Sequence, residues 1–142
     1  MSKSRIIKFF NLSFYNKLLL FELSFYTVWA YIMIRLFSFK RYLKWISNPK
    51  KDIYSEEIIK SLFFTIRKID KFAFWPTTCY TQAISARLYL RRKNIKSKIY
   101  LGMTKDENNQ LLAHAWTKIG DKIITGGNVN LDKYKVLYIF ED

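Results

Sequence analysis

Cys79 and His114 are the single cysteine and the single histidine among the 142 residues of this chain. Cys79 follows Thr77 and Thr78, either of which can cap a helix that begins there. In the first turn of a helix, free N–H groups and the positive end of the helix dipole stabilise a thiolate. We therefore predict that Cys79 is a nucleophile with a lowered thiol pKa. The ordinary alternative is an inert cysteine in an apolar core.

His114 is the candidate base. It lies 35 residues after Cys79, within a run of residues that reads as a β-strand. A helix that opens with a nucleophilic cysteine and packs on a sheet that carries the histidine would bring the two groups within hydrogen-bonding reach. The alternative is a strand histidine that merely satisfies a backbone carbonyl.

A third group is expected to orient the imidazole. A two-residue turn at 120–121 would place His114 opposite Gly127, where there is no carboxylate. Asn128 is the nearest side-chain acceptor, and Asp132 is the nearest acid beyond the turn. An asparagine can hold a catalytic histidine, as in the Cys-His-Asn arrangement, so Asn128 is predicted as the third member, with Asp132 as its alternative. The residues after the turn also read as ordinary loop chemistry.

The pattern of apolar residues along the chain changes from a helical spacing to short runs typical of strands. Helices are expected first, at 12–46 (one helix, or two with a break at Ser38), at 55–72 and from Thr77 or Thr78 to about residue 93. Short strands in an antiparallel meander are expected next, at 97–103, 111–119, 122–124 and 134–140. Helices followed by strands indicate an α+β fold, in which the helix that carries Cys79 packs on a small antiparallel sheet.

The composition bounds the function further. Half of the residues are apolar and the net charge is +14; residues 1–101 carry +15 and residues 102–142 carry −1. One cysteine and one histidine fall short of a zinc site, and no phosphate-binding loop, dinucleotide fingerprint or metalloprotease motif is present, so neither a metal nor a cofactor is expected. The basic cluster made by Arg87, 91–93, Lys96 and Lys98 could bind nucleic acid, membrane or an acidic peptide, but such runs are mostly solvated surface.

The N-terminal region is apolar and basic. Its longest uncharged stretch, residues 23–34, is shorter than the roughly 20 residues that span a bilayer, so a buried or interfacial helix fits better. Asn11, Asn16 and Lys17 interrupt the first apolar run and no small-residue cleavage site follows, so we interpret the segment as retained.

Several short motifs between residues 75 and 127 occur together. They are the pair Trp75-Pro76 before Cys79, a leucine-rich helix that ends in basic residues, and the sequence Ala-His-Ala-Trp around His114 before the turn at 120–121. This stretch resembles the transglutaminase-like leader peptidases of lasso-peptide biosynthesis. The resemblance is specific over about 50 residues and looser upstream.

The resemblance implies a papain-like cysteine peptidase core over 55–142, preceded by a helical lead-in over 1–54 that packs on it. It implies that Cys79 is the nucleophile and His114 the base of an enzyme that removes the leader from a ribosomally made precursor. The family's third member is an acid about a dozen residues after the histidine, and that position is Gly126. Asn128 or Asp132 could substitute for the acid, as could a backbone group or water.

The short chain also fits one half of a split system. The resemblance then implies a bacterial, cytoplasmic protein with three partners: the leader peptide of the precursor, a small winged-helix leader-binding protein and a cyclase resembling asparagine synthetase. Nucleic acid is not expected as a partner, whereas contact with a membrane surface stays open. Two further functions stay open, an acyltransferase on the same scaffold and a catalytically silent adaptor that binds a peptide or an anionic surface.

Overall fold

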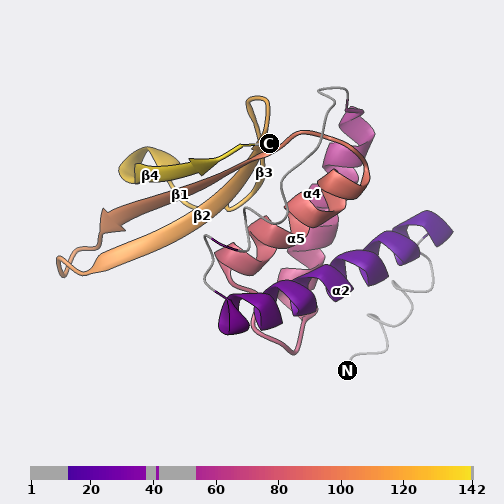
Figure 1. Cartoon of the computed structure of the whole chain (residues 1–142), viewed down its shortest axis with the longest axis horizontal. Helices are drawn as coiled ribbons and strands as arrows, with labels where there is room; N and C mark the ends of the chain where they lie inside the picture. Colours follow the sequence, from indigo (N-terminus) through magenta and orange to yellow (C-terminus); the bar gives the residue numbers. More distant parts are fainter. Residues whose placement is uncertain (1–12, 38–40, 42–53, 142) are drawn as a thin grey trace.

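The computed structural model describes residues 13–37, 41 and 54–141, so the predicted second part of the first helical region, residues 39–46, lies outside them except for residue 41. The described chain forms three helices followed by four strands and a short 3-10 helix. Their bounds are α2 Phe14–Leu36, α4 Glu56–Phe72, α5 Cys79–Arg92, β1 Lys98–Lys105, β2 Leu111–Ile119, β3 Lys122–Thr125, η1 Leu131–Lys133 and β4 Lys135–Phe140. The predicted α+β class is confirmed (Figure 1).

Local signals explain where α4 and α2 begin and end. The side chain of Ser55 accepts a hydrogen bond from Ile58 N at 3.2 Å and so caps α4, as its sequence predicts. Ser13 caps α2 in the same way by accepting from Asn16 N. The backbone leaves the helical conformation at Phe37, so α2 ends just before Ser38, the break expected from the sequence.

The helix α2 is longer than the uncharged stretch at residues 23–34. Its 23 residues are apolar enough for a membrane span by length and composition alone, a criterion that core helices of proteins also meet. One face of α2 is buried, through residues Leu19, Leu23, Thr27, Ala30 and Met33. This helix is therefore built into the domain along that face.

The sheet is antiparallel, with the strand order β3-β2-β1-β4. The expected meander is wrong in one respect, because β4 pairs with β1 and not with β3. After β3 the chain turns away at Gly126, which has φ +71°, and passes through η1 before it reaches the free edge of β1. The segment that follows β3 therefore contacts His114 on β2, through Gly126 and Tyr134.

The register of the β2–β3 hairpin also departs from the expected one. The two-residue turn is confirmed, and Lys118 pairs with Ile123, but an irregularity next to Lys118 shifts the pairing so that Thr117 faces Thr125. Since β3 ends at Thr125, the expectation that His114 lies opposite Gly127 is wrong. A β-bulge of this kind re-aims the residues beside it.

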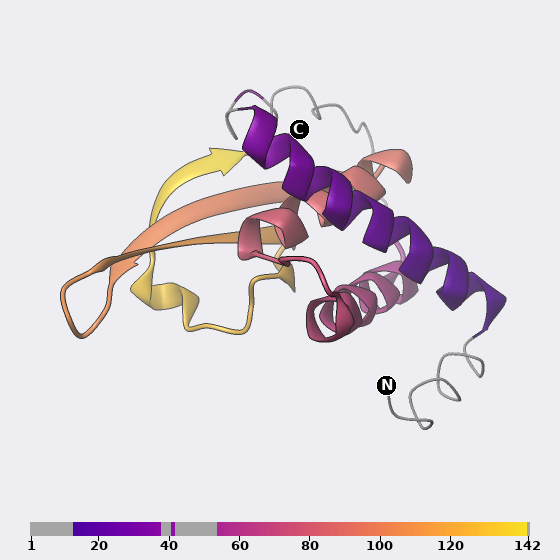
Figure 2. The ribbon, with the colours of Figure 1, turned by 90° about the horizontal axis from the view of Figure 1, so that it is seen from below.

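All three helices lie on one side of the sheet, and α2 crosses α5 (Figures 1 and 2). The Thr117 hydroxyl on β2 donates to the Ala83 carbonyl of α5 at 3.3 Å, which fixes the helix against the strand. Arg87 of α5 is 1% exposed, and its Nη1 donates to the carbonyls of Ser97 and Phe140 at 3.2 and 3.3 Å. The placement of Arg87 in a basic surface cluster is therefore wrong; it ties α5 to the ends of β1 and β4.

Candidate active site

Cys79 is the first residue of α5. Thr78 is the N-cap, and its hydroxyl accepts from Thr81 N at 3.3 Å, which confirms the predicted capping. The thiol is half-buried and packs against the apolar cluster that includes Ala83, Ile84 and Ala115. The cap thus places Cys79 where α5 begins and where the helix meets β2.

Opposing effects act on the Cys79 thiol. Burial raises its pKa and outweighs the hydrogen bonds to backbone N–H groups of Ala115, Tyr80 and Cys79 itself, which lower it. The net shift is upward, so the predicted lowering of the pKa is wrong. The helix terminus supplies the stabilising N–H groups as expected, but the apolar packing removes more hydration from the thiolate than these groups replace.

This upward shift of the Cys79 pKa predicts how the thiol reacts with alkylating agents. Because only the thiolate is nucleophilic, we expect slow alkylation by iodoacetamide at neutral pH and a rate that climbs steadily as the pH is raised above the pKa of an ordinary thiol. The measurement is the alkylation rate of the folded chain against pH, followed by intact mass. A rate that already levels off below neutral pH would contradict the upward shift.

The His114 imidazole on β2 is 8% exposed, and its Nε2 hydrogen-bonds the carbonyl of Gly126 at 2.8 Å. A carbonyl only accepts, so Nε2 carries the proton, and in the neutral ring Nδ1 carries the lone pair. The ring lies 5.3 Å from the Tyr134 ring and 6.1 Å from the Trp116 ring, centroid to centroid. The tautomer that these contacts hold is one that can accept a proton at Nδ1.

The structure brings Cys79 to β2, the strand that carries His114. The sulfur meets the backbone of Ala115, the residue directly after His114. Side chains alternate along a strand, so Ala115 faces α5 while His114 faces Trp116 and Tyr134. Within the described chain the hydrogen bond of the imidazole is made to Gly126 and not to the thiol. Proton transfer between the thiol and the imidazole requires the two groups to approach each other, for instance on substrate binding.

The partner of the imidazole is a backbone group, one of the options that the sequence left open. It comes from Gly126, the position at which the resemblance places an acid. A side chain is sterically excluded there, because a Cβ on Gly126 would lie 2.5 Å from the Ala115 oxygen and 2.9 Å from His114 Nε2. Asn128 and Asp132 are both exposed on the segment that follows, and their role as third member stays a prediction.

Asp70 is a further residue near Cys79, and no motif in the sequence singles it out. One oxygen of its carboxylate, Oδ1, accepts from Thr77 Oγ1 at 2.7 Å and from Gln82 Nε2 at 2.8 Å. It thus ties the end of α4 to both sides of Cys79. The side-chain amide of Gln82 is engaged by this contact.

Replacement of Asp70 by alanine is expected to loosen the start of α5. Two exposed hydrogen bonds contribute about 1 kcal/mol together, so a small loss of the free energy of unfolding should accompany a larger loss of turnover. Urea unfolding measures the first effect and the rate of substrate conversion the second. Asp121→Ala, in the β2–β3 turn, is the matched control, and an equal effect of both variants on turnover would refute the positioning role.

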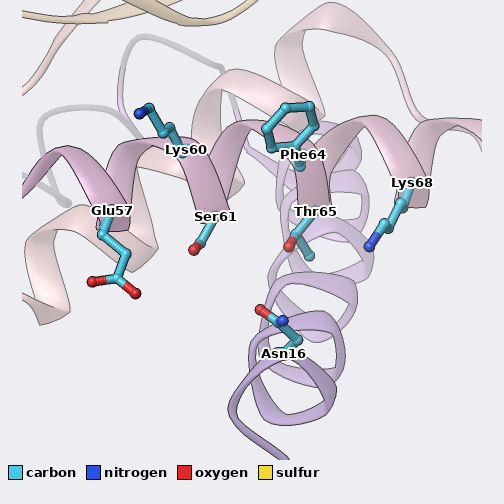
Figure 3. Close-up of a pocket in the computed structure, with 7 residues that line it drawn as sticks. All are labelled: Asn16, Glu57, Lys60, Ser61, Phe64, Thr65 and Lys68. Atoms are coloured by element: carbon cyan, nitrogen blue, oxygen red, sulfur yellow. The ribbon is translucent and has the colours of Figure 1, made fainter. Parts of the chain in front are cut away.

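A cleft of about 540 Å³ is lined by residues of the β1–β2 hairpin and of the segment that follows β3. Tyr134, which contacts the His114 ring, is one of its walls, and Leu112, two residues before His114 on the same strand face, is another. A second cleft of about 460 Å³ lies between α2 and α4, with Asn16, Lys60 and Lys68 in its lining and neither cysteine nor histidine (Figure 3). Cys79 and His114 do not line the cleft next to Tyr134 either, but this cleft borders a residue that contacts the imidazole.

The described residues contain no group of three or more histidine, cysteine or acidic side chains that could hold a metal ion. The chemistry available at this site therefore rests on the thiol at the start of α5, the imidazole on β2 and the backbone N–H groups around the sulfur. These are the parts of a covalent acyl transfer through a cysteine.

Comparison with known proteins agrees with this arrangement. A family model described as the transglutaminase-like superfamily matches residues 20–139. The chain belongs to the transglutaminase-like superfamily. This membership suggests activity of the cysteine peptidase or acyltransferase type. Searches of curated proteins and of solved structures returned no match.

The match to the transglutaminase-like superfamily begins within α2 and ends in β4. It includes the start of α5 and the strand that carries His114. The division of the chain into a lead-in over 1–54 and a core over 55–142 stays a prediction, and the superfamily match extends into both parts.

Proposed function

We propose that this transglutaminase-like protein is a cysteine peptidase that removes the leader from a ribosomally synthesised lasso-peptide precursor before ring closure. The observation that carries the proposal is the placement of Cys79 at the start of α5. Its sulfur contacts the backbone of Ala115, the residue directly after His114 on β2. The specific motifs between residues 75 and 127 support the leader peptide as substrate class.

In the proposed reaction, the thiol proton passes from Cys79 Sγ to Nδ1 of His114 as the sulfur attacks the scissile carbonyl. Backbone N–H groups of Cys79 and Tyr80, which have no helical partner at the start of α5, hold the oxyanion. The carbon–nitrogen bond then breaks, and the imidazolium gives its proton to the leaving amine. Water, deprotonated by the same Nδ1, hydrolyses the thioester and regenerates the thiol.

The Gly126 carbonyl supports both forms of the imidazole. It accepts from Nε2–H in the neutral ring and in the imidazolium, and so keeps Nδ1 available for the thiol proton. A carbonyl is uncharged and stabilises the imidazolium less than a carboxylate would. We therefore expect slower turnover than in an enzyme with an acidic third member.

The proposed partners follow from the same pathway. The precursor leader would be recognised with a small winged-helix leader-binding protein, and the core peptide would pass to a cyclase resembling asparagine synthetase. The cleft beside Tyr134 combines Lys105 and Lys133 with Asp106 and Glu107 around apolar side chains, a lining suited to an extended peptide. This site for the peptide is part of the proposal.

A catalytically silent adaptor is the second candidate function. Two observations favour it, the raised pKa of the Cys79 thiol and the glycine where the resemblance places an acid. It predicts that peptide binding continues without turnover. An acyltransferase differs only in the second nucleophile, an amine instead of water, and the mass of the product separates the two reactions.

The test combines the purified full-length chain with a candidate precursor and its leader-binding partner and follows peptide masses over time. We expect loss of the leader with wild type and an intact precursor with Cys79→Ala. An intact precursor in both samples, with the partner shown to bind leader, would overturn the peptidase for that substrate and favour the adaptor.

A further inference from the structure

The outward face of α2 carries a continuous stripe of large apolar side chains. Its members are spaced three or four residues apart, so they lie along one face of the helix. They are Phe14, Leu18, Phe21, Phe25, Trp29 and Ile32, and each is between 41% and 77% exposed. An exposed apolar stripe that runs along most of a helix marks an interaction surface.

The opposite face of α2 is held in the protein. Leu23 and Ala30 are fully buried there, and Trp75 Nε1 donates to Thr27 Oγ1 at 3.3 Å. A transmembrane orientation would break these contacts, although the length and composition of α2 would permit one. The arrangement suits a helix that lies flat, with its protein-facing side anchored and its outer side available (Figure 2).

The charges around the stripe favour one kind of partner. By helix geometry Lys17 and Arg35 flank the stripe on the same side. The single acid of α2 is Glu22, whose Oε1 lies 2.8 Å from Arg92 Nε. The whole chain carries +14. An apolar face edged with cations and aromatic rings matches a surface of anionic lipids, which needs no pockets or paired polar groups of the kind that a protein interface uses.

We propose that the outward face of α2 docks on an anionic phospholipid bilayer, with the helix parallel to the membrane surface. This property goes beyond the proposed peptidase activity and does not depend on it. Ala30 and Met33, in the C-terminal half of α2, pack in the cluster against which Cys79 lies. Docking would therefore hold the start of α5 close to the lipid surface.

The test is co-sedimentation of the full-length chain with vesicles. We expect strong binding to phosphatidylglycerol–phosphatidylcholine vesicles, weaker binding at high salt and little binding to phosphatidylcholine alone. Phe21→Gln with Phe25→Gln should weaken binding at least about tenfold, because two exposed rings no longer enter the interface. Lys17→Gln with Arg35→Gln should weaken it by about tenfold as well, through lost attraction to the headgroups.

A matched pair of leucines controls for general loss of apolar surface. Leu18 on the stripe is 53% exposed, and Leu111 at the start of β2 is 64% exposed. Leu18→Gln should weaken vesicle binding and Leu111→Gln should not, with unchanged circular dichroism for both.

Three results would overturn the proposal: wild type that stays in the supernatant with anionic vesicles, an equal effect of the two leucine variants, or a double phenylalanine variant that binds like wild type. The first result would leave the stripe as a docking face for a protein partner. None of the three results would bear on the proposed peptidase activity, because vesicle binding requires no turnover.

Discussion

Replacement of Cys79 by alanine is expected to reduce substrate conversion by about 10⁴-fold or more, and His114→Ala should lose nearly as much. In the proposed covalent mechanism the two groups act as a unit, so removing either one should remove most of the rate enhancement. The measurement is the rate of leader removal from the precursor in the presence of the leader-binding partner. Both variants should still bind the precursor, because neither residue lines the cleft that is proposed for the peptide.

Substitutions near His114 act as controls for this prediction. Asn128→Ala and Asp132→Ala remove the two side chains that the sequence put forward as the third member. If the Gly126 carbonyl alone orients the imidazole, both variants keep most of the turnover. A loss for one of them comparable to that of His114→Ala would assign it as the third member. Retained turnover in Cys79→Ala would contradict the covalent mechanism itself.

Replacement of Gly126 by alanine should have the largest effect of any change outside the two reacting groups. Gly126 has φ +71°, which costs alanine about 1–2 kcal/mol. Its new Cβ would also lie 2.5 Å from the Ala115 oxygen and 2.8 Å from Trp116 Cβ. Relief of these clashes must move the segment that holds the imidazole. We expect a loss of about 2–4 kcal/mol in the free energy of unfolding and severely reduced turnover.

Gly127→Ala is the matched control for this change. A Cβ on Gly127 would meet Ile123 Cγ2 at 3.0 Å, a side chain that can adjust. We expect a stability within about 1 kcal/mol of wild type and nearly normal turnover. Urea unfolding and the cleavage assay measure the two quantities for both variants. Equal stability of the two variants would contradict the special role of position 126.

The features that the sequence predicts well are those that depend on near neighbours. The caps at Ser55 and Thr78 are read from residue types within one helical turn, and the structure confirms both. The strand over Leu111–Ile119 is likewise confirmed, because apolar and β-branched residues between two turns mark it. Cys79 and His114 stand out because each is the single residue of its kind in a chain with helix and strand signals around it.

The features that the sequence misses depend on long-range packing or on the backbone. The sequences of β4 and β1 do not show that these two strands pair, since the edge of an antiparallel sheet can pair with many different strands. The upward shift of the Cys79 pKa comes from packing against Ala115 and the surrounding cluster. The partner of His114 is a carbonyl, which no side-chain pattern displays, although a glycine at the position of an expected acid was a signal.

The same limits apply to Arg87 and Asp70. A run of basic residues suggested that Arg87 is on the surface, whereas its position on the inner face of α5 buries it. Asp70 lies near the end of α4, and no sequence pattern marks it as part of a site. The chain turns back after α4 and so brings Thr77 and Gln82 into contact with it. In both cases the deciding contact joins residues that separate elements bring together.

Assistance of the Cys79 nucleophile by His114 is the step on which the proposed reaction depends. Its most direct test is the rate at which p-nitrophenyl acetate acetylates Cys79, measured by peptide mass after quenching and confirmed by loss of the acetyl group with neutral hydroxylamine, which cleaves thioesters but not lysine amides. We expect a thioester on Cys79 that forms much faster in wild type than in His114→Ala. Equal rates in the two proteins, or acetylation confined to lysines, would contradict it.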